Sequence, residues 1–175
     1  MKKIFLTFAK NDQEANKTIA GILEKLSNDD REKDRKSYYK SLSGLFMHNT
    51  GCTVYFLNML KDAVPGNEAA QKALKPLAKV SELKGKLTED QWKQAVSFSK
   101  IVDKALVDFI GALEDGDFEA QVKVEWYKGK PPTAPLYFML EQQVAHNIHH
   151  RGQISQILDS LKIDNDYSGI NIKFL

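Results

Sequence analysis

The sequence predicts an all-α protein built as a four-helix bundle. In four long stretches, apolar residues recur every three or four positions, the spacing of one face of a helix. The stripes have a mean period near 3.5, as expected for helices that pack almost lengthwise on one another. The length of 175 residues is that of one domain, so a single domain over residues 1–175 is expected.

The first helix is predicted over residues 5–26, and its stripe has one polar member, Asp12. A helix that begins later, with Asn11 as its N-cap, is the alternative. The longer helix is preferred because the stripe continues unbroken through that point. The mixed-charge residues 27–36 are then expected to form a connection.

A second helix is predicted over residues 37–62, although Gly44 and Gly51 each lower its helix propensity. The loss relative to alanine is roughly 1 kcal/mol per glycine. A proline and a glycine at residues 65–66 end the helix. The segment that follows is expected to hold at most a short helix, around residues 68–78, and to cross over between long helices.

The third helix is predicted to start with a capping box formed by Thr88 and Gln91, and its stripe runs over residues 92–113. The apolar period then changes to two over residues 118–126, the pattern of a half-buried strand. Glycine and proline in residues 128–132 predict a turn. A small extended hairpin or flap is therefore expected between the third and fourth helices.

The fourth helix is predicted over roughly residues 134–160, with Pro135 in its first turn, where a missing N–H costs little. Its stripe is apolar at both ends and polar in the middle, at Gln143, Asn147 and His150. The residues after Leu161 are expected to form an irregular strap.

Composition excludes several classes of function. Twenty-five basic residues against twenty-three acidic ones give a net charge of +2, so no nucleic-acid partner is expected. The single cysteine, Cys52, rules out an intrachain disulfide framework and favours a reducing compartment. No apolar run approaches the roughly 20 residues that cross a bilayer, and the run at residues 4–9 is too short for a signal peptide. A soluble, cytoplasmic protein without a membrane partner is expected.

Three of the four histidines lie within residues 146–150. His146 and His150 are four positions apart, so on a helix they can aim ring nitrogens at one point. His149 is rotated by about 100° from His150 and is set aside. Two ligands from one helix rarely suffice, and His48 is the only other histidine. His48 lies near the midpoint of the second predicted helix, and the pair brackets the midpoint of the fourth, so neighbouring helices would bring all three to one level.

The residues alone leave two interpretations of this cluster open: core histidines hydrogen-bonded to neighbours, or ligands of one divalent cation. Burying unpaired imidazoles costs roughly 1–3 kcal/mol each, whereas a shared cation would satisfy one nitrogen of each ring. Asp12, Gln143 and Asn147 are candidates to hold imidazole N–H groups. Cys52, four residues after His48, is either a small apolar filler or a group that approaches the metal.

The run His-Asn-Ile-His-His-Arg-Gly-Gln at residues 146–153 resembles the signature of the DinB family, a histidine, three residues and then His-Arg-Gly-Gln. Residues 34–39, leading to His48 and Asn49, are similar to the family's second-helix entry and its lone histidine. Residues 8–11, with Asn16, resemble the start of its first helix. The likeness covers nearly the whole chain.

The resemblance implies a four-helix bundle in a variant of up-and-down topology, often a homodimer. It also implies a divalent metal held by His48, His146 and His150. Ala145 departs from the family, which often has asparagine before the first motif histidine, and this difference bears on the groups around the ligands.

Three histidines on an ion with open positions describe a catalytic rather than a closed structural site, and zinc, nickel or iron(II) fits. Relatives implied by the resemblance include thiol-dependent S-transferases and an isomerase that use low-molecular-weight thiols. The first hypothesis is a metal-dependent transferase or hydrolase-like enzyme. Its expected reaction is the transfer of a small thiol to a small-molecule substrate in stress or detoxification. The alternatives are a non-catalytic metal-binding stress-response or interaction protein, and a structural polar layer that holds no metal.

Overall fold

The computed structural model describes residues 1–124 and 133–174. The four long helices are α1 (Lys2–Leu23), α3 (Leu42–Ala63), α5 (Glu89–Ala112) and α6 (Leu136–Ser160). The shorter elements are the helices α2 (Asn28–Glu32) and α4 (Glu68–Ala73), the 3₁₀ helices η1 (Lys75–Lys79), η2 (Asp115–Glu119) and η3 (Ile172–Phe174), and the strands β1 (Gln121–Lys123) and β2 (Thr133–Pro135). The prediction of a mostly helical chain is confirmed.

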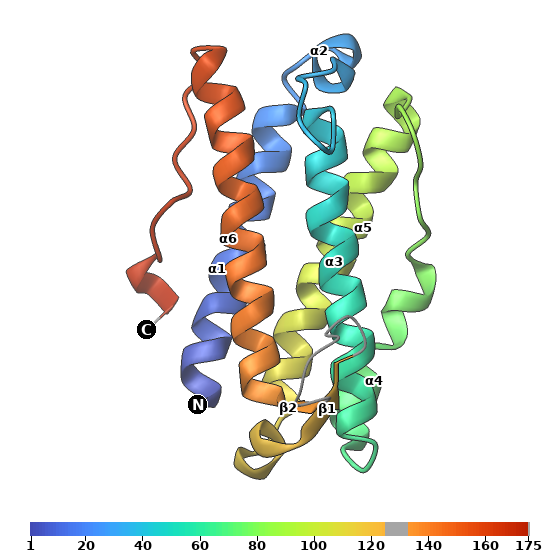
Figure 1. The fold of residues 1–175 in the computed structure, drawn as a ribbon, viewed down its shortest axis with the longest axis vertical. Helices are drawn as coiled ribbons and strands as arrows, with labels where there is room; N and C mark the ends of the chain where they lie inside the picture. Colours follow the sequence, from blue (N-terminus) through green and yellow to red (C-terminus); the bar gives the residue numbers. More distant parts are fainter. Residues whose placement is uncertain (125–132, 175) are drawn as a thin grey trace.

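The long helices lie side by side, with α1 and α6 running in one direction and α3 and α5 in the other (Figure 1). The closest pairs are α1 with α5 and α3 with α6. Because α3 and α5 run in the same direction, residues 64–88 must return along the length of the molecule between them (Figure 1). This is the crossover that the sequence predicted, and α4 and η1 lie within it.

Helix α1 starts at Lys2, so the longer helix is confirmed and a start at Asn11 is wrong. Residues 27–36 are not only a connection, because they contain α2. The Ser27 hydroxyl accepts a hydrogen bond from the Asp30 N–H, which caps the first turn of this short helix.

The sequence predicted that the second long helix starts at residue 37, but α3 begins at Leu42. Lys36 and Lys40 have φ angles of 60° and 64°, and this left-handed conformation cannot continue a right-handed helix. The helix starts directly afterwards, where the Ser41 hydroxyl accepts a hydrogen bond from the Gly44 N–H at 3.0 Å. Tyr38 therefore lies outside the helix and is 89% exposed.

The predicted capping box of α5 is present, with Thr88 and Gln91 each accepting a backbone hydrogen bond of the other. All members of its predicted stripe are buried: Trp92, Ala95, Ser99, Val102, Leu106, Phe109 and Leu113. Helix α6 starts at Leu136, with Pro135 at the N-cap position just before the first turn.

The predicted strand at residues 118–126 is shorter in the structure. Of its described residues, 118–124, only those of β1 pair with another strand, and Val122 lies opposite Ala134 of antiparallel β2. Phe118 belongs instead to η2, where it is fully buried. Residues 125–132, which include the predicted turn, lie outside the described residues.

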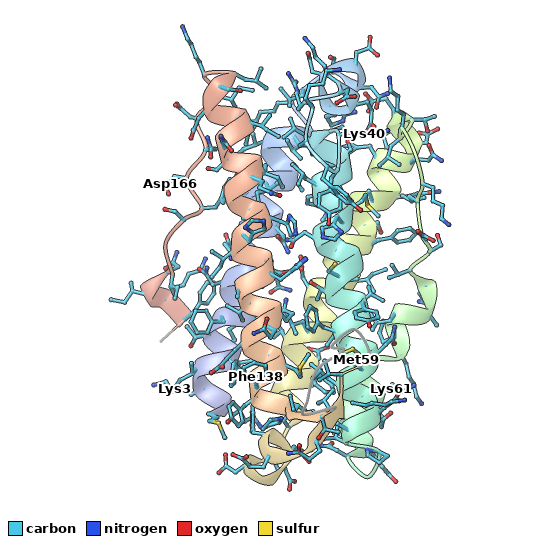
Figure 2. The ribbon with its side chains drawn as sticks, in the orientation of Figure 1. Lys3, Lys40, Met59, Lys61, Phe138 and Asp166 are labelled. Atoms are coloured by element: carbon cyan, nitrogen blue, oxygen red, sulfur yellow. The ribbon has the colours of Figure 1, made fainter. Side chains whose placement is uncertain are left out.

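The core consists of two apolar clusters with a buried polar layer between them. One cluster contains Phe5, Phe56, Phe109 and Leu136 and extends to Met59. Figure 2 shows Met59 and Phe138 toward one end of the molecule and Lys40 toward the other. The second cluster contains Ile19, Leu23, Leu42, Leu45, Trp92, Ile154 and Leu158. Buried polar side chains between them include Asp12, Asn16, Asn49, Ser99, Asp103, Asn147 and Arg151.

Among the described residues, no helix combines the length and the apolar character needed to cross a membrane.

Candidate metal centre

Three histidine rings from α3 and α6 meet at one point. The Nε2 atom of His48 lies 3.2 Å from Nε2 of His146 and 3.1 Å from Nε2 of His150. The Nε2 atoms of His146 and His150 are 3.1 Å apart. The structure thus brings together the three residues that the sequence selected, because α3 and α6 are direct neighbours.

Hydrogen bonds among these three nitrogens cannot satisfy all of them. The Nε2 atom of a neutral imidazole is either a donor or an acceptor, so at least two of the three must have the same role and repel. One cation would accept all three lone pairs. Two nitrogens about 2.1 Å from one ion lie about 3.0 Å apart at a right angle and about 3.4 Å apart at the tetrahedral angle. The observed separations of 3.1–3.2 Å fall between these limits, so the donor set fits a divalent ion.

A hydrogen bond on the outer side of the His150 ring determines which ring nitrogen keeps its lone pair. Its Nδ1 lies 2.7 Å from Oε1 of Gln153, and an amide oxygen can only accept, so Nδ1 carries the hydrogen. The Nε2 atom of His150 therefore presents its lone pair to the cluster. The Nδ1 atom of His146 is buried and has no hydrogen-bond partner among the described residues.

The surroundings favour the uncharged form of all three rings. Burial, together with the neighbouring His150 and His146, lowers the pKa of His48 to about 4. Burial also lowers the pKa of His146 and of His150 below the ordinary value. Neutral imidazoles are the form that binds metal, so the cluster is ready for a cation near neutral pH.

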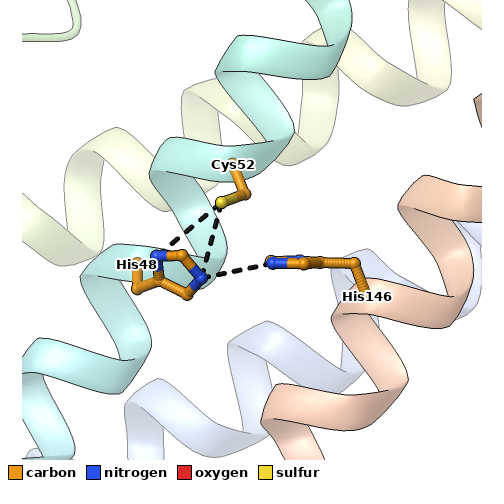
Figure 3. A group of neighbouring side chains, drawn as sticks. All are labelled: His48, Cys52 and His146. Atoms are coloured by element: carbon orange, nitrogen blue, oxygen red, sulfur yellow. Dashed lines mark hydrogen bonds between the residues drawn. The ribbon is translucent and has the colours of Figure 1, made fainter. Parts of the chain in front are cut away.

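Cys52 lies one turn after His48 on α3 and faces the same point (Figure 3). Its Sγ is 3.5 Å from Nε2 and 3.7 Å from Nδ1 of His48. The ligand atoms of His48, Cys52 and His146 all lie within 4.8 Å of one another, so these residues form a second possible metal-binding set. Burial raises the pKa of the Cys52 thiol, which favours the protonated form. We favour the three nitrogens because each pair is close to the separation that a shared ion requires.

Two neighbours of the histidines were missed by sequence reasoning. Tyr39 stacks on the His48 ring at 3.8 Å between centroids and meets the edge of the His150 ring at 5.3 Å. It lies in the irregular loop before α3, where no periodicity marks it. Gln153, the partner of His150, did carry a signal, because it lies three residues later on the same helix face.

The polar residues that were candidates to hold the imidazoles form hydrogen bonds with one another and with other side chains. Asp12 accepts a hydrogen bond from Asn147 at 2.7 Å and forms a buried ion pair with Arg151. The Gln143 amide donates to the Thr53 hydroxyl at 3.4 Å. Asp12, one of the candidates, thus bonds to Arg151 and Asn147 rather than to a histidine, and Gln153 is the residue that accepts from His150. His149 is exposed, as expected from its rotation.

The chain is mostly helical, and histidine and cysteine ligand atoms gather between two of its long helices. It is therefore a helical protein with a possible metal site in its interior. The chain belongs to the DinB family, whose model matches residues 1–161. The match covers α1 to α6 and thus every residue of the cluster, which confirms the resemblance drawn from the sequence. A search of curated proteins and a search of solved structures found no match.

Proposed function

We propose that the protein is a metal-dependent enzyme that holds one divalent ion through Nε2 of His48, His146 and His150. The observation that carries this proposal is the mutual contact of three neutral ring nitrogens at 3.1–3.2 Å, which hydrogen bonds cannot satisfy. Zinc, nickel and iron(II) all bind imidazole, and three protein ligands leave positions open for water or substrate.

The proposed reaction is transfer of a small thiol to an electrophile, in stress or detoxification. A divalent ion at this site would lower the pKa of a thiol or of water. The thiol would release its proton to water, and the sulfur lone pair would form the new bond to the electrophilic carbon. The electron pair of the bond that breaks would go to the halide, to the epoxide oxygen or to the second carbon of the double bond, and the latter two would take up a proton. Gln153 would hold the His150 ring in place, and Tyr39 would support His48 by stacking. With water in place of the thiol, the same site would act as a hydrolase.

Metal content tests the ligand assignment. We expect the purified protein to hold about one divalent ion per chain, and His48→Ala and His150→Ala to lose it. His149→Ala is the matched control, because it removes an exposed imidazole that presents no nitrogen to the cluster; the contact that it loses is the one at 3.2 Å between Nε2 of His149 and the amide nitrogen of Gln153. Wild-type protein without stoichiometric metal, after incubation with zinc, nickel and iron(II), would reject the site.

Turnover tests the chemistry separately. The metal-loaded protein is assayed against low-molecular-weight thiols combined with alkyl halides, epoxides and activated double bonds, with loss of free thiol as the readout. We expect the wild type to show turnover and His150→Ala to show none. In the wild type, turnover should stop when the metal is removed by a chelator and return when the metal is added back. If the protein holds stoichiometric metal but turns over no pair of thiol and electrophile, the proposal of an enzyme is rejected and the proposal of a metal site stands.

A second candidate is a non-catalytic metal-binding protein that acts in a stress response or through a partner. Cys52 favours it, because its sulfur lies 3.5 Å from Nε2 of His48 and would close the site as a fourth ligand. Cys52→Ala separates the two candidates. The catalytic proposal expects metal and turnover to be retained, whereas a closed site expects weaker metal binding by roughly tenfold or more.

We also propose that the four long helices form the four-helix bundle of the family, in the variant up-and-down topology, as one domain over residues 1–175. A homodimer is the proposed assembly. Light scattering of the purified protein would give its mass in solution, and a value near 19.8 kDa would reject the dimer.

A further inference from the structure

Asn147 follows His146 directly on α6, and two acceptors fix the orientation of its buried amide. The side chain is 1% exposed. Its Nδ2 donates to Oδ2 of Asp12 at 2.7 Å and to the Thr53 hydroxyl at 3.4 Å. A carboxylate has no proton to donate, and the proton of the Thr53 hydroxyl goes to the Asn49 carbonyl at 3.2 Å. The amide nitrogen therefore faces both groups, and the amide oxygen faces away from them.

Two buried polar atoms on these consecutive residues have no partner. Neither Oδ1 of Asn147 nor Nδ1 of His146 forms a hydrogen bond with any residue that the structure describes. The amide oxygen is an acceptor. The ring nitrogen is a donor whenever Nε2 of His146 gives its lone pair to a metal ion, because a neutral imidazole then carries its one hydrogen on Nδ1. Each atom is thus the kind of partner that the other lacks, and burial makes an unpaired polar atom costly.

The electrostatics of the His146 ring place the amide oxygen on its side. Burial is the main cause that lowers the pKa of His146, and the Asn147 side chain acts against it by favouring the protonated ring. Only a hydrogen-bond acceptor favours a protonated imidazole, since an N–H group would oppose it. The oxygen of Asn147 therefore lies toward the ring, as the contacts of its nitrogen require.

Asp12 holds the Asn147 amide from a third helix. It lies on α1 and is 2% exposed. One carboxylate oxygen forms the buried ion pair with Arg151, and the other accepts from Asn147. Arg151 lies one turn after Asn147 on α6, so two side chains from one helix face hold the same carboxylate. Helix α1 is thus connected to the metal centre although it supplies no ligand.

We propose that Asn147 is a positioning residue for His146, and that in the metal-bound protein its amide oxygen accepts a hydrogen bond from the outer N–H of that ring. This inference rests on the proposed metal site and adds to it a residue that does not bind the ion. Asn147 gives His146 the support that Gln153 gives His150. Both α6 ligands then have their outer nitrogen held by an amide oxygen, and Asp12 keeps the Asn147 amide in the required orientation.

The hydrogen bond is tested by NMR on protein with ¹⁵N-labelled histidine and bound zinc. Metal content is measured first, and a protein that holds no zinc overturns the proposed metal site and this inference together. In the zinc-bound wild type, we expect the Nδ1 proton of His146 to appear at low field and to exchange slowly with water, like that of His150 beside Gln153. If zinc is bound but the His146 proton exchanges like that of a free imidazole, only the role of Asn147 is overturned.

Asn147→Leu removes the acceptor and nearly keeps the volume of the side chain. We expect the His146 proton to move upfield and exchange faster, and zinc affinity to fall by about 10–100-fold. The His150 proton should not change, which separates a local effect from a general loosening of the structure. Gln143→Leu is the matched control, because Gln143 is an equally buried amide on α6 that donates to the same Thr53 hydroxyl. It should leave both protons and the zinc affinity as in the wild type.

Thermal unfolding shows whether each variant is folded. If Asn147→Leu does not fold, Asn147→Ala is measured in the same way, because it removes the acceptor without adding a contact. An unchanged His146 proton in a folded Asn147 variant contradicts the proposal. Loss of that proton in Gln143→Leu also contradicts it, and would make Gln143 the partner of the His146 ring.

Discussion

Gln153 accepts a hydrogen bond from the outer nitrogen of His150 and so fixes the orientation of that ring. We predict that Gln153→Ala weakens metal binding by about 10–100-fold, because the His150 ring loses the acceptor that sets its tautomer. Competition with a chromogenic chelator measures the affinity. Gln153→Glu should restore most of the loss, since a carboxylate also accepts from Nδ1.

Gln142→Ala controls for the loss of an amide on α6, because Gln142 is exposed. Unchanged metal affinity in Gln153→Ala would show that packing alone, including the Tyr39 stack, orients the His150 ring.

Asp103 is a buried acid in the polar layer, and it accepts hydrogen bonds from Asn16 at 2.8 Å and from Ser99 at 3.3 Å. Burial is the main cause that raises its pKa to about 8, and nearby Asp12 acts in the same direction. The folded protein thus carries a proton that the unfolded chain, with its ordinary pKa of 3.8, has lost. Folding stability contributed by Asp103 is therefore present at low pH and is lost as pH rises toward 8.

Asp103→Asn has no titrating proton at this position, so it isolates the effect. We predict that the unfolding free energy of the wild type falls relative to the variant between about pH 5 and pH 8, by up to about 1.4 kcal/mol per pH unit. Urea unfolding at several pH values measures it. The lowered pKa of His48 has the opposite sign, but it is common to both proteins and cancels in the difference. Parallel curves for the two proteins would contradict the raised pKa.

The start of α3 depends on one glycine. A Cβ atom added at Gly44 would lie 2.2 Å from the carbonyl oxygen of Tyr39, whereas one added at Gly51 would meet nothing within 4 Å. We predict that Gly44→Ala lowers the unfolding free energy by roughly 1–3 kcal/mol, because the backbone before the helix must shift. Gly51→Ala should raise it by up to about 1 kcal/mol through helix propensity.

Chemical denaturation of both variants measures these changes on the same helix. Because Tyr39 stacks on His48, Gly44→Ala should also weaken metal binding, and Gly51→Ala should not. Equal stability changes in the two variants would mean that the close approach of the Tyr39 carbonyl is absent in solution.

The ends of a helix could be predicted where a capping motif and the apolar periodicity agreed. They could not be predicted where the backbone adopts a left-handed conformation. The α5 start follows from a capping box and an unbroken apolar stripe, and both are local properties of the sequence. The late start of α3 depends on left-handed conformations at Lys36 and Lys40. Lysine rarely adopts this conformation, so the residue type does not predict it. Among the described residues after Phe118, only the three of β1 pair with β2, because the pairing depends on a distant segment that the alternation does not reveal.

The meeting of the histidines was predicted from helix midpoints, and the structure changes that reasoning. Since α3 starts at Leu42, His48 lies only about 9 Å from its beginning rather than at its middle. The rings still meet because α6 is antiparallel to α3 and places its central turns beside this first part of α3 (Figure 1). Tyr39 and a cavity of about 850 Å³ that His48 and Cys52 line could not be predicted, since they depend on the routes of the loop before α3 and of residues 80–87.

A metal ion held by His48 and the two α6 histidines would link two helices that are nearly a hundred residues apart in sequence. An ion that binds only the folded state stabilises it by about 2.7 kcal/mol when the free ion is a hundred times its Kd. For a chain of this length we predict a rise in Tm of roughly 5–10 °C on metal loading, reversed by a chelator. Differential scanning calorimetry of loaded and stripped protein measures it. His149→Ala should show the full rise and His150→Ala almost none, and an equal rise in both would mean that the ion binds elsewhere.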